Sequence, residues 1–521
     1  MAKLARRCVV FVSVAVASVL VPAAPSSSVP PNANARDRTF TFAPTRPPAD
    51  AAGSERSQAP RSNTMGDGRA TWQARAPEST FGFDAIPRIG GNWPADPTGA
   101  MGVSWFFTAV NTSYALYDLT GVPVVGPNPL RSLFSLPTGT QVFDPKVVYD
   151  QYDDTFVLAF LGVNDARRRS WILFVTIPNA TASDPETWCG AIVNGDRTAG
   201  DGRQFADYPG LGYSSDHVVV TANTFAFDDL AFEGAIALAF PKTRLYDCDR
   251  TLAFDTFLGG QTTNPDGSPA FGLQPATTVG PGRQLLMLSF QPGRPNFVVL
   301  WRLREARNDL ALKRTAFRVN DVGIAPFATQ GDGSLETANT WWDPGDLRLI
   351  NAFADLDRGR VYGAHVIARD LGPDTQTGGY VEAAIRWYEV RLSARLPRSR
   401  IARFGTIGEA ETDAGWPTLG TDADGNLFVT YNRASAVTGE FLSAWVAEVV
   451  PGATNATTAL LRAGTARMEA IPGPERWGDY NGLSRDPLSG AFVAVVNQIA
   501  VADGGGATDD WQQVVHAVGH V

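Results

Sequence analysis

The sequence predicts an all-β fold, a single β-propeller of seven four-stranded blades. Short apolar strands, rich in β-branched and aromatic residues, alternate with turn residues throughout residues 81–521. A repeating unit returns roughly every 50 to 75 residues, close to the period of propeller blades that carry loops. Gly (51) and Pro (36) are abundant, which suits many tight turns and few long helices.

The repeating unit has a polar and aromatic opening, a turn and an apolar strand. It is clearest in residues 476–497, where Arg476-Trp477-Gly478-Asp479-Tyr480 opens the unit and 491–497 is the apolar strand. Weaker versions open at Asp144-Pro145, Asp207-Tyr208-Pro209 and Trp416-Pro417. Such a unit is one supersecondary piece of a repeat fold.

Each unit is expected to provide an apolar strand and a partner strand that follows it. The expected apolar strands are 105–110, 156–160, 218–222, 285–290, 361–367, 427–431 and 492–496. The expected partners are 114–119, 171–177, 235–240, 297–303, 384–390, 444–449 and 511–518. Helical spacing of apolar residues is weak and confined to residues 303–312.

The two ends of the ordered region are expected to meet. The last expected hairpin ends at the C-terminus, so residues 81–88 would complete the final blade and close the ring with N- and C-terminal strands. A closed ring leaves no exposed sheet edges. Six or eight blades, or two stacked β-sandwiches, are the alternatives that the pattern leaves open.

The N-terminal residues have the composition of a targeting segment. Residues 1–23 read as a signal peptide, with Lys3, Arg6 and Arg7 before an apolar run that ends at a small-residue cleavage site. Residues 24–80, rich in Pro, Ala, Ser and Arg, are expected to be a disordered leader, and residues 81–521 one domain. Because no later stretch is long enough to span a bilayer, we expect a secreted, soluble monomer in an extracellular or periplasmic location.

Charge and cysteine content narrow the partners. A net charge of −9 argues against nucleic acid and anionic membrane surfaces. Cys189 and Cys248 remain after signal cleavage, and an oxidising compartment favours a disulfide between them. It would close a loop of about 60 residues and stabilise the fold by roughly 3–4 kcal/mol. Two buried free thiols are the alternative.

No cofactor and no metal are expected. Four histidines and the two remaining cysteines form no cluster with the spacing of a metal site. Residues 422–426 resemble the opening of a calcium loop but lack the distal Glu, so a plain turn is favoured over calcium. Motifs for a serine nucleophile, a zinc protease, a P-loop or a dinucleotide site are absent.

The openings of the units are expected to gather at one mouth of the central channel, because the innermost strand of each blade lines it. The candidate catalytic residues are Asp144, Asp207, Asp343 and Asp479. The candidate ligand-binding residues are Arg203, Tyr208, Arg348, Trp416, Arg476, Trp477 and Tyr480, and Lys146 and Gln274 belong to the same ring.

These residue types suit a polyhydroxylated or acidic sugar. Arginine binds carboxylates in a bidentate way, aromatic rings cover the apolar faces of sugars, and two carboxyl groups facing each other are needed for glycoside hydrolysis. The alternative is structural, since each Asp can cap the backbone of the next blade.

Residues 144–150, 207–209 and 476–480 resemble the opening motifs of secreted bacterial sialidase-like propellers, most of which have no assigned activity. The resemblance covers the whole ordered region and implies the fold. Sialidases add turns of the form Ser-x-Asp-x-Gly-x-Thr-Trp, whereas residues 355–362 and 422–428 lack the Ser and the Thr-Trp. Two functions are therefore expected: a glycan-cleaving hydrolase, or a non-catalytic propeller that binds a glycan or an extracellular protein.

Overall fold

The computed structural model describes residues 76–89, 94–196, 203–248, 253–293, 295–306, 309–331, 341–372, 381–468, 475–502 and 510–520. The predicted signal peptide and residues 24–75 of the predicted leader lie outside the described residues. Helices are short: α1 (Lys242–Leu245) and the 3₁₀ turns η1 (Leu130–Leu133), η2 (Asp165–Arg167), η3 (Asn179–Thr181), η4 (Pro185–Thr187), η5 (Gly259–Thr262) and η7 (Leu396–Arg398). Within the described ranges, no helix has the length and apolar character needed to cross a membrane.

Five sheets each contain four antiparallel strands. Four of them follow chain order from strand to strand: β2 (Thr98–Met101), β3 (Trp105–Val110), β4 (Ser113–Asp118), β5 (Pro123–Pro129); β6 (Gln141–Asp150), β7 (Thr155–Asn164), β8 (Arg169–Pro178), β9 (Cys189–Asn194); β10 (Gln204–Tyr213), β11 (His217–Ala226), β12 (Phe232–Pro241), β13 (Asp255–Phe257); β24 (Asp413–Thr421), β25 (Leu427–Ser435), β26 (Glu440–Val449), β27 (Thr457–Arg462). The fifth joins both ends of the domain: β28 (Gly482–Arg485), β29 (Phe492–Val501), β30 (Asp510–Gly519), β1 (Glu78–Pro87).

A further sheet has eight strands in two four-stranded halves. Its strands are β14 (Gln274–Val279), β15 (Leu285–Gln291), β16 (Asn296–Ala306), β17 (Asp309–Val319), β20 (Asn351–Asp355), β21 (Arg360–Arg369), β22 (Glu382–Arg391) and β23 (Arg400–Ile407). The halves are joined where β14 and β20 run parallel, with Ala276 opposite Ala352. A small separate pair consists of β18 (Ala328–Thr329) and β19 (Trp341–Trp342).

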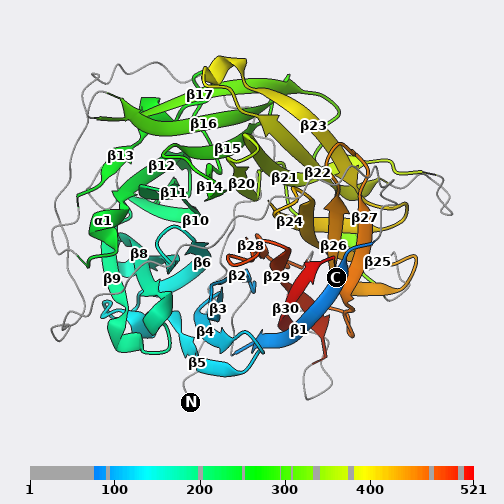
Figure 1. Cartoon of the computed structure of the whole chain (residues 1–521), viewed down its shortest axis with the longest axis horizontal. Helices are drawn as coiled ribbons and strands as arrows, with labels where there is room; N and C mark the ends of the chain where they lie inside the picture. The colour runs from blue at the N-terminus through cyan, green and yellow to red at the C-terminus, as the bar shows by residue number, and fades with distance from the viewer. Residues whose placement is uncertain are drawn as a thin grey trace, which may run out of the picture.

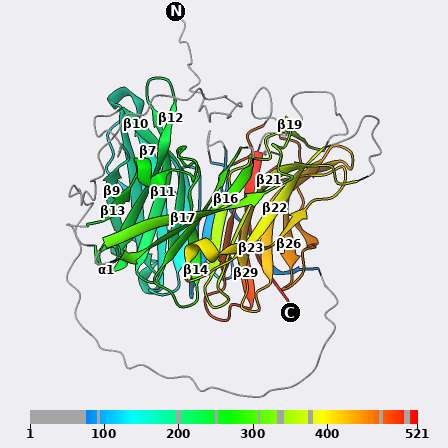
Figure 2. The same ribbon diagram turned by 90° about the horizontal axis from the view of Figure 1, so that it is seen from above.

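The sheets stand around a common centre. The first strands β2, β6, β10, β14, β20, β24 and β28 contact one another in this order, and β28 contacts β2. Figure 1 shows these strands around the middle of the molecule, with the later strands of each sheet farther out. Figure 2 shows the same sheets from the side, with strands running between two faces. This radial arrangement of antiparallel sheets is that of a β-propeller.

The predicted strands correspond to the second and third strands of the sheets. Residues 156–160, for example, lie in β7 and residues 171–177 in β8. β1 pairs with β30, with Phe81 opposite Ala517, which confirms the predicted meeting of the two ends. Residues 303–306 and 309–312 are not helical but belong to the paired strands β16 and β17, where Leu303 and Leu312 face each other as a cross-strand pair.

The predicted disulfide is present and joins two neighbouring sheets. Cys189 begins β9 and Cys248 follows α1, with their Cα atoms 5.7 Å apart. Apolar side chains pack between these sheets as well, including Phe174 and Phe240, whose ring centres are 4.8 Å apart. The sheets are therefore held to their neighbours mainly by burial of apolar surface, with one covalent link in addition.

Candidate functional site

The channel-lining segments share a local feature, a residue with positive φ followed by Pro. Such a φ is uncommon for a residue other than Gly, and a following Pro restricts the backbone further. Strand pairing in β6, β10 and β24 shifts register at the same place, which marks a β-bulge. The residues and their φ values are Asp96 (45°), Asp144 (52°), Tyr208 (51°) and Trp416 (51°).

These bulges contribute to a group of charged and aromatic side chains at one mouth of the channel, which we call the mouth cluster. Its members come from the segments around β2, β6, β10, β20 and β28 and act on one another through contacts or charge. They are Asp96, Asp144, Lys146, Asp207, Tyr208, Asp343, Asp346, Arg348, Arg476, Asp479 and Tyr480.

Two aspartates of the mouth cluster cap the backbone of another sheet. The Asp96 carboxylate accepts hydrogen bonds from the Asp479 N–H (2.6 Å) and the Asn111 side-chain amide (2.5 Å). The Asp144 carboxylate accepts one from the Tyr208 N–H (3.2 Å). Asn111 in turn accepts the Asp144 N–H at 2.7 Å. Burial of these donors without acceptors would cost free energy, so this part of the cluster has a structural role.

Two arginines bring positive charge to the same place. Arg476 donates to the Asp479 carboxylate at 2.7 Å, and its side chain is 21% exposed. Arg348 donates through Nε to both oxygens of Asp346 at 2.9 Å and lies 4.4 Å from the centre of the Tyr208 ring. Both guanidinium groups reach the surface of the cluster, since the Arg348 side chain is 16% exposed.

The pKa values of the carboxyl groups in the mouth cluster are shifted in opposite directions. Burial would raise the pKa of Asp479, but the charges of Arg476 and Arg348 outweigh it and hold the pKa below its usual value. Burial and the neighbouring Asp479 raise the pKa of Asp207. Burial also raises the pKa of Asp96 to about 7, and that of Asp343 above its usual value. A carboxyl group with a lowered pKa therefore lies among carboxyl groups whose pKa values are raised.

The pKa of the Asp144 carboxyl group is shifted in the same direction as that of Asp207. Burial, followed by the charges of Asp207 and Asp96, raises its pKa well above the usual range. Asp207 and Asp343 are half-buried, whereas Asp144 and Asp479 are each 6% exposed. The carboxyl groups that combine a raised pKa with access to solvent are thus Asp207 and Asp343.

Lys146 lies over aromatic rings. Its Nζ is 3.0 Å from the centre of the Tyr480 ring and 5.7 Å from that of Tyr208. Burial lowers the pKa of Lys146 to about 7, although the carboxyl groups of Asp144 and Asp96 act in the opposite direction. The residue is half-buried, so part of the side chain remains accessible.

Several predicted ligand-binding residues are inside the protein. Trp416, Trp477 and Tyr480 are each 1% exposed and Tyr208 is 3% exposed. The Trp416 indole donates to the Asp343 carbonyl (2.8 Å), and the Tyr480 hydroxyl donates to the Pro145 carbonyl (2.8 Å). These rings form the walls beneath the charged groups.

Two other predicted residues lie outside the charged group. Arg203 is exposed just before β10, where its carbonyl accepts the Phe227 N–H and its side chain lies near Asp228. Gln274 is buried at the start of β14, where its backbone pairs with Leu288.

Sequence reasoning missed Asp96, Asp346 and Asn111. Asp96 had a usable signal, because Asp96-Pro97 repeats the Asp144-Pro145 dipeptide one unit earlier. Asp346 stands two residues before Arg348, a spacing that gives no indication of a bidentate pair. Asn111 follows β3, and only the folded ring shows that its side chain holds Asp144 and Asp96 together.

Deeper in the channel there is little space. A cavity of about 20 Å³, room for about one water molecule, lies among side chains of the inner strands such as Val147, Tyr213, Phe353 and Leu483.

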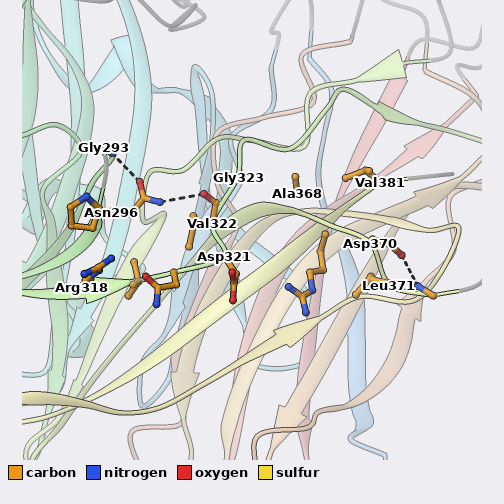
Figure 3. Close-up of a pocket in the computed structure, with 15 residues that line it drawn as sticks. Gly293, Asn296, Arg318, Asp321, Val322, Gly323, Ala368, Asp370, Leu371 and Val381 are labelled. Carbon is orange, nitrogen blue, oxygen red and sulfur yellow. Dashed lines mark hydrogen bonds between the residues drawn. The ribbon is translucent and has the colours of Figure 1, made fainter.

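A wide groove of about 1130 Å³ lies elsewhere, between the end of β17, the following loop and the ends of β21 and β22 (Figure 3). Its polar groups bond locally: Asn296 donates to the Val322 carbonyl (3.3 Å) and Asp370 accepts the Gly372 N–H (3.2 Å). Because its charged side chains, Arg318 and Asp321 among them, are not brought into contact, the mouth cluster is the better candidate site.

No metal site is evident within the described ranges, where no three His, Cys, Asp or Glu side chains gather as metal ligands. In the calcium-like loop, both carboxylate oxygens of Asp422 accept hydrogen bonds from Asn426, at 2.9 and 2.7 Å. Asp355, in the other partial motif, pairs with Arg358 at 2.9 Å.

No known family model matches the chain, and no curated protein matches it. Among solved structures, a protein of unknown function from Dyadobacter fermentans is 13% identical, with a TM-score of 0.36 and coverage of 73% of this chain and 100% of the other. A Trypanosoma rangeli sialidase mutant with trans-sialidase activity is 9% identical (TM-score 0.37; 83% and 59%), and the GH93 α-L-arabinofuranosidase of Fusarium graminearum is 8% identical (0.37; 84% and 98%). Identities this low leave the function to the chain's own residues.

Proposed function

We propose that the chain is a seven-bladed β-propeller, the eight-stranded sheet counting as two blades, and that it cleaves a glycan at the mouth cluster. The observation that supports this proposal most is that the pKa values of two carboxyl groups are shifted in opposite directions. The pKa of Asp479 is held below its usual value beside Arg476, while that of half-buried Asp207 is raised above its usual value.

Glycoside hydrolysis needs such a pair, because one carboxyl group must protonate the leaving oxygen while another acts as carboxylate. In this proposal Asp207 is the general acid and Asp479 the nucleophile or base. Asp343, also half-buried with a raised pKa, is the second candidate for the acid. Asp144 supports the site instead, since its carboxylate caps the Tyr208 N–H.

Arg348 and Arg476 would select the substrate. Both guanidinium groups reach the surface and present donors that suit sugar hydroxyls or a carboxylate. We propose a secreted monomer that needs neither metal nor cofactor. Light scattering would test the monomer, and unchanged turnover in EDTA would support the absence of a metal requirement, calcium included.

A second candidate is a non-catalytic propeller that binds a glycan or an extracellular protein on the same face. It is favoured by the caps, since carboxylates of Asp96 and Asp144 are already used by backbone N–H groups. Within this candidate the burial of Trp416 and Tyr480 favours a protein partner over a glycan, because rings that do not reach solvent cannot stack on a sugar.

The experiment is to incubate the full chain with sialosides and with plant and bacterial polysaccharides, and to assay new reducing ends. Asp207→Asn and Asp479→Asn are expected to lower kcat by about 10²–10⁴-fold, with Asp228→Asn, at an exposed residue, as the control. Retention of a glycan without turnover would replace hydrolysis by the second candidate. Neither turnover nor glycan retention would refute both glycan roles.

A further inference from the structure

We propose that Lys146 is a nucleophilic amine that forms a reversible imine at the channel mouth with a small carbonyl compound carrying an anionic group, of the 2-oxo-acid class. This inference goes beyond glycan hydrolysis and does not depend on it. It begins with a local excess of unused donors around the Tyr208 ring.

Three polar groups around this ring have no hydrogen-bond acceptor among the described residues. Lys146 Nζ makes neither an ion pair nor a hydrogen bond there, and its contacts are the faces of Tyr480 and Tyr208. The terminal nitrogens of Arg348 are likewise unbonded, since only Nε is used on Asp346. The Tyr208 hydroxyl is buried without a partner, in a residue that is 3% exposed.

Of these groups the Tyr208 hydroxyl is the buried one, and a buried donor without an acceptor is rare and indicates a missing ligand or water. An anionic group suits this place, because the Arg348 guanidinium lies over the Tyr208 ring with its terminal N–H donors unused. Its ion pair with Asp346 engages Nε alone. A carbonyl carbon bound beside that anion would lie near the Lys146 amine.

The surroundings also favour the neutral, nucleophilic amine. Burial lowers the pKa of Lys146 to about 7, and the Arg348 charge contributes in the same direction. The groups that oppose it are the carboxyls of Asp144, Asp96 and Asp479. Lysines desolvated next to another cation are the ones that form Schiff bases in proteins.

The reaction balances without an oxidant. The Nζ lone pair attacks the carbonyl carbon, a C–N bond forms, and the oxygen takes a proton to become a hydroxyl. The nitrogen then loses its two protons, the C–O bond breaks, and water leaves as the C=N bond forms. Asp144, two residues before Lys146 on β6 and one of the groups whose charge acts on it, would pass these protons.

The sequence offers internal controls, because the chain contains only Lys3, Lys146, Lys242 and Lys313. Lys313 is exposed, and Lys242 is 3% exposed and paired with Asp150 at 2.5 Å. A single peptide map can therefore compare three environments in one folded molecule.

The test is to treat the full chain with pyruvate and sodium cyanoborohydride at pH 7 and to quantify reduced adducts at each lysine by mass spectrometry. We expect the adduct at Lys146 to exceed that at Lys313 by at least about tenfold, because an ordinary lysine is almost fully protonated at this pH. In urea the preference should disappear. Lysine labelling that is no faster at Lys146 than at Lys313 in the folded chain would overturn the inference.

Two further comparisons test its parts. Hydroxyacetone, an uncharged ketone of similar size, should label Lys146 several-fold less than pyruvate does, and equal labelling would refute the anionic class. Lys146→Arg should remove the adduct at this site and leave that at Lys313. Labelling at Lys146 without glycan cleavage would support this inference and refute the proposed hydrolysis. Glycan cleavage without preferential labelling at Lys146 would support the hydrolysis and refute this inference.

Discussion

Strand β6 takes part in two lysine-containing clusters, one around Lys146 in the middle of the strand and one around Asp150 at its C-terminal end, and the two clusters are built differently. At the mouth, Lys146 lies over Tyr480 and Tyr208 without an ion pair to a described residue. At the C-terminal end, Lys242 from α1 lies 4.8 Å from the Tyr152 ring centre and pairs with Asp150 of β6 at 2.5 Å. Both lysines therefore lie among tyrosines and aspartates.

The difference is in how completely the charges are satisfied. Asp150 also accepts from the Tyr246 hydroxyl (2.7 Å) and the Tyr152 N–H (3.1 Å), and Lys242 makes a second ion pair with Asp153 (3.1 Å). A buried pair completed in this way maintains structure, and its removal is costly. The mouth cluster has charges and donors to spare, which is the property expected of a site. The first prediction tests this contrast directly.

Lys242→Met is expected to destabilise the fold by about 3–5 kcal/mol, because it leaves the fully buried Asp150 carboxylate without its cation. Lys146→Met is expected to change the free energy of unfolding by less than about 1 kcal/mol, because it removes no ion pair and leaves an apolar chain on two rings. Urea unfolding of both variants measures the difference.

The control is the double variant Lys242→Met/Asp150→Asn, which removes both charges and should regain part of the loss. Equal destabilisation by the two single methionine substitutions would show that the two lysines are held alike, contrary to the comparison.

The disulfide lies on the side of the Lys242 cluster, because it links β9 to the segment after α1. Cys189→Ser/Cys248→Ser should lower the unfolding free energy by about 2–4 kcal/mol through the greater freedom of the unfolded chain. Labelling of Lys146 should be unaffected, because the disulfide lies beside α1 and not in the mouth cluster. A loss of labelling in the folded double variant would mean that the two clusters are coupled.

At the mouth, the residues that hold structure are the caps. Asp96→Ala should cost about 1–3 kcal/mol, since it leaves the Asp479 N–H buried without its acceptor and leaves the Asn111 amide with the Pro94 carbonyl alone. Asp96→Asn, which keeps an acceptor oxygen, should lose less. Thermal or urea unfolding decides this, and an Asp96→Ala variant as stable as the wild type would remove the capping role.

The sequence contained most of the fold and part of the site. Strands such as 156–160 were predictable because an apolar, β-branched run between turns has few other solutions. Asp144 and Asp479 were predictable as members of one ring because their motifs repeat. Whether a given Asp caps a backbone or faces solvent was not predictable, since Asp96 meets the Asp479 N–H across 383 residues of sequence.

The smallest expected effect is a change in the slope of stability against pH. The pKa of Asp96 is raised to about 7 in the fold, so its contribution is greatest below the usual pKa of 3.8 and is lost as pH rises towards 7. Asp144 and Asp207 have raised pKa values and act in the same direction. The pKa of Lys146 is lowered to about 7, so stability is regained between pH 7 and 10.5.

The mouth cluster should therefore contribute least to stability near pH 7. Urea midpoints measured from pH 4 to 10 should fall and then rise, Asp96→Asn should flatten the falling part, and Lys146→Met the rising part. Lys313→Met, at an exposed lysine, is the matched control and should alter neither. If Lys146→Met leaves the rising part intact, the Lys146 amine is charged at neutral pH. The rings of Tyr480 and Tyr208 and the Arg348 cation then do not make it a nucleophile, and this property does not distinguish the mouth cluster from the Lys242 cluster.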